Sequence, residues 1–138
     1  MLILVADAGI VLYGALAVAT PSLLTAGYES YSGTSWTSLV ARAPETAAYL
    51  LLVYRMVGGL NVALGITLIA IIVGPFRRGE RWAWFALLVG NVLGFGVPMT
   101  YDHITGAIGF FEILEFVAIA AVLVVLALSF RRGRAGVP

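Results

Sequence analysis

Two glutamates and an arginine in otherwise apolar stretches are the residues of this sequence best suited to chemistry. Glu112 and Glu115 are three positions apart, so they share one face of a helix. Arg55 could bind a carboxylate through two parallel hydrogen bonds. One glutamate would then stay ionised, while apolar surroundings could hold the other protonated as a general acid. Asp102 or His103 could relay the proton.

These residues fall in one layer near the outer boundary of a bilayer. Measured from the basic or aromatic residues at the inner ends of their helices, the heights are about 33 Å for Arg55, about 30 Å for Asp102, about 28 Å for Glu112, and about 24 Å for Glu115 and Asn61. The hydrocarbon core is about 30 Å thick. Candidate catalytic residues are therefore Glu112, Glu115, His103 and Asp102, and candidate ligand-binding residues are Arg55, Asn61, Glu112 and Glu115.

Two further polar residues fall outside this layer. Asp7 lies about six residues into the first apolar stretch, near the inner side, and Asn91 falls near mid-membrane. We expect neither to join the outer layer, and the two are too sparse for a proton relay across the membrane. Asp7 is expected to be a packing or capping carboxylate, or to meet a cation of a partner chain.

The outer layer has three interpretations. Ionisable residues in a span usually face the bundle interior and pair with one another, so Arg55 and a glutamate could form a buried ion pair that fixes helix register. The same groups could bind or process a lipid-like or isoprenoid-like molecule that enters sideways between apolar walls. They could also simply reach headgroups and water. No metal-ligand spacing is present, so no metal or other cofactor is expected.

The composition indicates which elements must position these groups. The chain has 138 residues, of which 62% are hydrophobic and only 11% are charged, against about 25% charged in a typical soluble domain. Its mean hydropathy is +1.04. A soluble enzyme, a nucleic-acid binder and a disordered tail are excluded on this ground. The chain has no Cys and one His, so disulfides, thiolate chemistry and two-histidine sites are excluded as well.

Four apolar stretches predict an all-α polytopic membrane protein, a four-transmembrane-helix bundle forming one integral membrane domain over residues 1–138. The spans are expected at about 2–20, 47–73, 82–99 and 104–130. The outer loop, 21–45, could carry a short surface helix over Ser35–Ala43 or be irregular, and Thr100–Thr105 is expected to be a turn. The first stretch is expected to be retained, because no basic residue precedes it and Asp7 interrupts it.

Arginine placement predicts the orientation. Arg77, Arg78 and Arg81 fill the loop between the second and third spans, and Arg131, Arg132 and Arg134 follow the fourth. The positive-inside rule then places both termini in the cytoplasm of a multi-pass protein in a plasma (inner) membrane. All eight basic residues are Arg, a usage common in GC-rich bacterial genomes.

The stretch Arg55–Ile66, RMVGGLNVALGI, resembles the R-x-x-G-G-x-x-x-A-x-G signature of small uncharacterised bacterial four-span proteins near the DoxX-like group. The basic loop Arg77–Arg81 and a glutamate early in the last span, Glu112 or Glu115, are similar to that group too. The resemblance covers about Ala47 to Leu126. It implies a four-helix membrane bundle and no defined activity. DoxX-like proteins have been linked to redox partners, but a chain without Cys does not fit a thiol role.

Glycine patterns favour an accessory or structural function. Gly58 and Gly65 lie on one stripe of the second span, and Gly90 and Gly94 form a GxxxG in the third, which indicates close helix packing within or between chains. We therefore expect a protein that self-associates or joins a larger membrane complex, with membrane lipids as further partners and no nucleic acid. The alternative is a small membrane enzyme or binding protein that holds an apolar ligand at the outer Arg/Glu/Asp/His cluster.

Overall fold

The computed structural model describes residues 1–106 and 110–134, and the side chains of residues 1–106 and 113–130. Every regular element in these ranges is helical, which confirms the predicted all-α class. The elements in chain order are α1 (Leu2–Ala19), η1 (Pro21–Leu24), α2 (Thr25–Ser32), α3 (Trp36–Arg42), α4 (Pro44–Ile71), η2 (Ile72–Phe76), α5 (Arg81–Thr105) and α6 (Phe110–Arg134). In the described part of the chain, four helical segments are long and apolar enough to cross a membrane.

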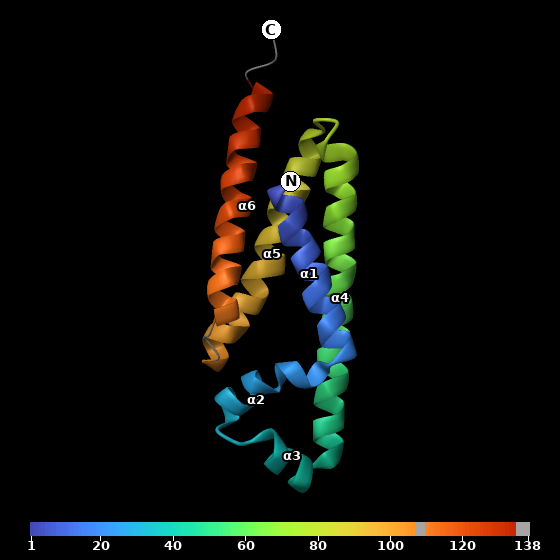
Figure 1. Ribbon diagram of the computed structural model, residues 1–138, viewed down its shortest axis with the longest axis vertical. Helices are drawn as coiled ribbons and strands as arrows, with labels where there is room; N and C mark the ends of the chain where they lie inside the picture. The colour runs from blue at the N-terminus through green and yellow to red at the C-terminus, as the bar shows by residue number, and fades with distance from the viewer. Residues whose placement is uncertain (107–109, 135–138) are drawn as a thin grey trace.

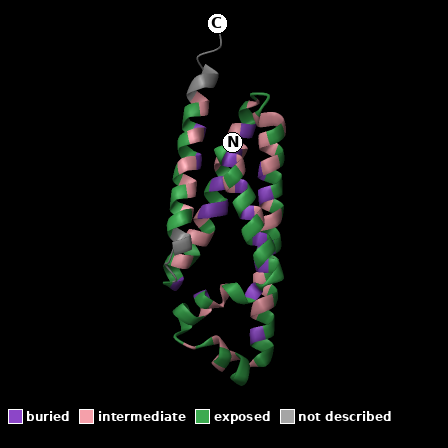
Figure 2. Ribbon diagram, in the orientation of Figure 1, coloured by how far each residue is buried: buried purple, intermediate pink, exposed green. Residues whose placement is uncertain are grey.

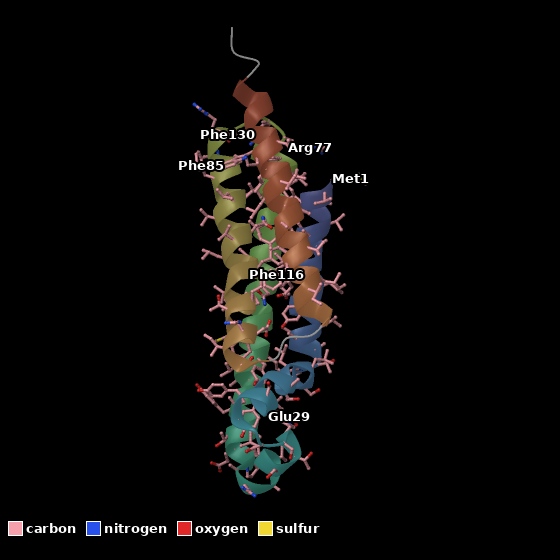
Figure 3. All side chains as sticks on the ribbon, turned by 90° about the vertical axis from the view of Figure 1, so that its left-hand side faces the viewer. Met1, Glu29, Arg77, Phe85, Phe116 and Phe130 are labelled. Atoms are coloured by element: carbon pink, nitrogen blue, oxygen red, sulfur yellow. The ribbon has the colours of Figure 1, made fainter. Side chains whose placement is uncertain are left out.

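The four long helices close into a ring in the order α1, α4, α5, α6 (Figure 1). The start of α1, the loop between α4 and α5, and the end of α6 lie at one end of the bundle, here called the terminal end. The opposite end carries η1, α2 and α3 and is called the cap end. Figure 3 shows Met1, Arg77 and Phe130 toward the terminal end and Glu29 in the cap. This arrangement is the relative placement that the arginine pattern predicts.

Close packing of α1 on α4 is the main tertiary contact of the bundle. A Cβ added to Gly14 would lie 2.6 Å from the Gly58 carbonyl oxygen, and one added to Gly58 would lie 2.7 Å from the Gly14 carbonyl oxygen. At Gly65 it would lie 2.6 Å from Cγ2 of Val11. The backbones of α1 and α4 can approach this closely only because glycine places no side chain between them. The predicted Gly58–Gly65 stripe is therefore used inside the chain.

The core runs along the inner faces of the four helices, and the buried residues form narrow stripes in Figure 2. Its buried hydrophobic members are Ile3, Ile10, Leu68, Leu87, Phe95, Val122 and Leu126. Gly90 and Gly94 of the predicted GxxxG face side chains of α4, Leu68 and Leu64 respectively. Most large apolar side chains point outward, as expected for helices whose outer faces meet lipid tails.

The third span is longer than expected. Thr100–Thr105, which the sequence predicts to be a turn, forms the last turns of α5, and α6 begins at Phe110, whereas the fourth span is predicted to begin near Ile104. Pro98 lacks an N–H, so the Gly94 carbonyl loses its usual helical donor, but a proline is tolerated within a membrane helix. The helix ends at Gly106, whose φ of 71° suits glycine.

Of the two predictions for the outer loop, a short helix or an irregular loop, the structure has the helix. Trp36–Arg42 is helical, and Ser35 caps this helix by accepting a hydrogen bond from the Ser38 N–H at 3.2 Å. Residues 21–32 add a 3₁₀ turn and the eight-residue helix α2. At 28 residues, α4 is about 42 Å long. It therefore extends past a bilayer core, and α3 packs against it.

Polar contacts fasten the terminal end. The indole N–H of Trp84 donates to the Leu126 carbonyl at 2.7 Å, which joins α5 to α6. In the α4–α5 loop, Glu80 accepts hydrogen bonds from Arg78 at 2.8 Å and from Trp82 at 2.6 Å. These bonds, first that from Arg78, hold the pKa of the Glu80 carboxyl below its usual range. The predicted basic loop is therefore partly neutralised by its own glutamate.

Candidate functional site

The outer layer predicted from the sequence contains two residues of α4. Arg55 is exposed on this helix, and its guanidinium has no ion-pair partner among the side chains that the structure describes. Asn61 is half-buried and lies against α1, because its Cβ is 3.0 Å from the position of a Cβ on Gly14. These two candidates therefore lie on different sides of α4.

The other candidates lie on α5 and α6. Asp102 is half-buried and His103 is exposed in the last turn of α5. Glu115 is half-buried on α6, with one carboxylate oxygen shielded from solvent. Both Glu115 and Asp102 interact with other groups. The side chain of Glu112 lies outside the described residues. Among the described residues, no three His, Cys, Asp or Glu side chains gather as metal ligands would.

No salt bridge joins Arg55 to Glu115 among the described side chains. The first is on α4 and the second on α6, and these helices lie across the ring from each other (Figure 1). Arg55 also faces outward, whereas one oxygen of Glu115 is shielded. In the described part of the chain, then, the two groups belong to the same predicted layer but do not form one site.

A group of tyrosines occupies the outer layer as well. Tyr54 of α4 lies beside Tyr101 of α5 and Tyr28 of α2. The Tyr101 hydroxyl is 3.0 Å from the position of a Cβ on Gly27, and the rings of Tyr28 and Trp36 meet edge to face at 5.8 Å. These aromatic side chains join the cap to the bundle. The sequence does indicate their height, because Tyr54 directly precedes Arg55 and Tyr101 directly precedes Asp102.

Asp7 and Asn91, which the sequence analysis leaves outside the outer layer, lie together inside the bundle. The Asn91 side chain lies beside the Asp7 carboxyl, within reach of a hydrogen bond. Both side chains are 0% exposed. Asp7 falls between Ile3 and Ile10 on the buried stripe of α1, and Asn91 lies on the stripe of α5 that includes Leu87. The spacing of Ile3, Asp7 and Ile10, at i, i+4 and i+7, is the signal that places Asp7 inward.

The hydrogen bonding of this pair is incomplete. Asn91 Nδ2 donates to the Leu87 carbonyl at 2.9 Å, one turn earlier on α5. Neither oxygen of Asp7, nor Oδ1 of Asn91, has a hydrogen-bond partner of good geometry among the described atoms. The Asp7 backbone also lies at the tightest part of the α1–α4 contact, since its carbonyl oxygen is 3.0 Å from the position of a Cβ on Gly65.

Comparison with known proteins adds no relative. No protein-family model matches the chain, and no curated protein and no solved structure is similar to it. A functional assignment therefore depends on the residues and their geometry.

Proposed function

We propose that this chain is an accessory or structural protein of a bacterial inner membrane that associates with a second copy of itself through α4. Four helices long and apolar enough to cross a membrane account for most of the described residues, and the cap is the largest described segment outside them. The inner arginines and the exposed Arg55 would contact anionic headgroups, so lipids are the other expected partners.

The observation that carries this proposal is a stripe of small residues on the exposed face of α4, here called the α4 stripe. It consists of Gly59, Ala63, Thr67 and Ala70, all exposed. A Cβ added to Gly59 would meet nothing within 4 Å. The Thr67 hydroxyl donates to the Ala63 carbonyl at 2.8 Å, so its polar group is already satisfied.

Spacing makes the α4 stripe a suitable helix-packing surface. Its members recur every three or four residues, so they line one face of the helix. The exposed side chains of Leu60 and Ile66 flank it on either side, and the exposed Met56 lies about one turn before Gly59 on the same face. Small-xxx-small surfaces let helix backbones approach closely in lipid, where the hydrophobic effect does not drive association.

A second copy is the simplest occupant because a two-fold axis brings the α4 stripe against itself. The opposite face of α4 makes the same kind of contact within the chain, with Gly58 and Gly65 against α1. One helix would then carry two close-packing faces, one used inside the chain and one between copies. Arg55 lies one turn beyond Gly59, at the edge of the membrane core, where its charge can reach headgroups.

Disulfide cross-linking tests this contact directly, because the chain has no native Cys. Ala63→Cys is expected to give a disulfide-linked dimer in native membranes under mild oxidation. The matched control is Val117→Cys on α6, which is 61% exposed and lies 14 residues before Arg131, as Ala63 lies 14 before Arg77. This variant is expected to stay monomeric. Equal cross-linking of the two variants, or none at Ala63, would contradict the proposal.

A further inference from the structure

Three shielded oxygen atoms lie on two neighbouring side chains in the core, one on α1 and one on α5. Two belong to the Asp7 carboxyl and one is Oδ1 of Asn91, and all three are acceptors without a donor of good geometry among the described atoms. The nearest amide nitrogen, Asn91 Nδ2, already gives one N–H to the Leu87 carbonyl. Buried acceptors are almost always satisfied in folded proteins, so a hydrogen-bond donor is expected at this group.

Described cations are too far away to supply it. Arg55 lies ten residues along α4 from Gly65, the residue next to the Asp7 backbone, a helical distance of about 15 Å. Arg81 lies ten residues before Asn91 on α5, again about 15 Å away. Both arginines are exposed at the ends of the bundle. An ionised Asp7 would therefore stand without a counter-charge from the described side chains.

The remaining titratable groups of the neighbouring helices do not change this. On α6, Glu115 lies seven residues from the core residue Val122, about 10 Å toward the cap. On α1 itself, Tyr13 is exposed and the amino group of Met1 lies at the exposed helix start. The outer ends of α4 and α5 carry Tyr54, Tyr101, Asp102 and His103, and η1 carries no titratable side chain.

We infer that the Asp7–Asn91 pair is a proton-binding site inside the membrane bundle, with the proton held on the Asp7 carboxyl and shared with Oδ1 of Asn91. The proton neutralises the carboxyl, since an isolated charge in an apolar interior costs far more than a neutral acid. The acid O–H donates to Asn91 Oδ1. The second N–H of Asn91 can donate to the other Asp7 oxygen, which closes a two-bond ring between acid and amide.

A metal cation fits the site less well than a proton. Hard cations such as calcium take six to eight oxygen ligands, whereas the pair offers three shielded oxygens. Proton binding also couples the site to helix packing. Loss of the proton leaves a carboxylate between α1 and α5, so the bundle must admit water or separate these helices before the proton can leave. The site is then a point at which the packing of α1 responds to protonation.

Infrared spectroscopy of the full chain in lipid vesicles at pH 7 tests the site, because a protonated carboxyl and a carboxylate absorb at different frequencies. Solvent-exposed Asp and Glu are ionised at this pH. The wild-type spectrum is expected to contain a carboxylic-acid C=O band that Asp7→Asn removes. The variant keeps the shape of the pair and forms an amide–amide contact. The control, Glu115→Gln, removes a carboxyl of α6 and is expected to keep the Asp7 band.

Two further arms identify the bound species. Asn91→Leu is expected to shift the frequency of the Asp7 band, since the acid loses its partner, and exchange of K⁺ for Na⁺ is expected to leave the wild-type band unchanged. Absence of any acid band that depends on Asp7 would overturn the inference. Loss of the band in Na⁺ would overturn it in favour of a sodium site. If Asn91→Leu does not fold, the comparison of wild type with Asp7→Asn still decides.

Discussion

Gly14→Leu is expected to destabilise the bundle by about 3 kcal/mol or more, the upper range for overpacked interiors. A Cβ at this position would lie 2.6 Å from the Gly58 carbonyl oxygen and 2.8 Å from the Val62 nitrogen. Both are backbone atoms, so no rotamer change can relieve the clash and α1 must move away from α4. The measurement is equilibrium unfolding in detergent micelles, followed by tryptophan fluorescence.

The control for this substitution is on the same helix. Gly9→Leu adds the same side chain where a Cβ meets nothing within 4 Å, on the exposed side of α1. Its helix propensity gain over glycine is the same as at Gly14. We expect Gly9→Leu to be neutral or slightly stabilising. Equal destabilisation by the two variants would show that α1 does not pack on α4 through Gly14.

Leu87→Ala is expected to cost about 2–4 kcal/mol, within the range for leucine truncations that leave a cavity. Leu87 is 0% exposed and belongs to the core shared by the four long helices. The lost contacts are dispersion contacts, which lipid cannot replace inside the bundle. The same unfolding measurement reports this loss.

Leu93→Ala is the matched variant, because Leu93 lies on α5 two turns away and is 57% exposed. Its side chain faces the surface that lipid tails would cover, so truncation is expected to change the free energy of unfolding by less than about 0.5 kcal/mol. If both leucines cost the same, α5 does not present the Leu87 face to the core.

Much of the bundle could be predicted from the sequence because lipid imposes few choices on it. Apolar runs of sufficient length must be helical, and the arginines pair the two termini with the α4–α5 loop. Gly58 and Gly65 indicated close packing, and α1 uses both. The end of the third span was predicted too early, near Pro98, because a proline within a membrane helix does not always end it.

The candidate site was harder to predict, since height along a helix is not position around the ring. Arg55 and Glu115 fall in the same predicted layer, yet Arg55 faces outward from α4 and no salt bridge joins the two. Counting residues puts Asp7 near the inner side of its span and Asn91 near mid-membrane, and these heights do not show that the two side chains meet. They meet because each falls on the buried stripe of its own helix. That stripe is set by the direction in which a side chain leaves the helix, and not by its depth in the membrane.

The proposed contact through the α4 stripe joins two copies of the chain, and native mass spectrometry from a mild detergent measures copy number directly. The wild type is expected to be a dimer. Gly59→Leu, which fills the stripe, is expected to be a folded monomer, and Gly96→Leu on α5, where a Cβ also meets nothing within 4 Å, is expected to remain a dimer. A monomeric wild type, or a dimer that survives Gly59→Leu, would contradict the claim.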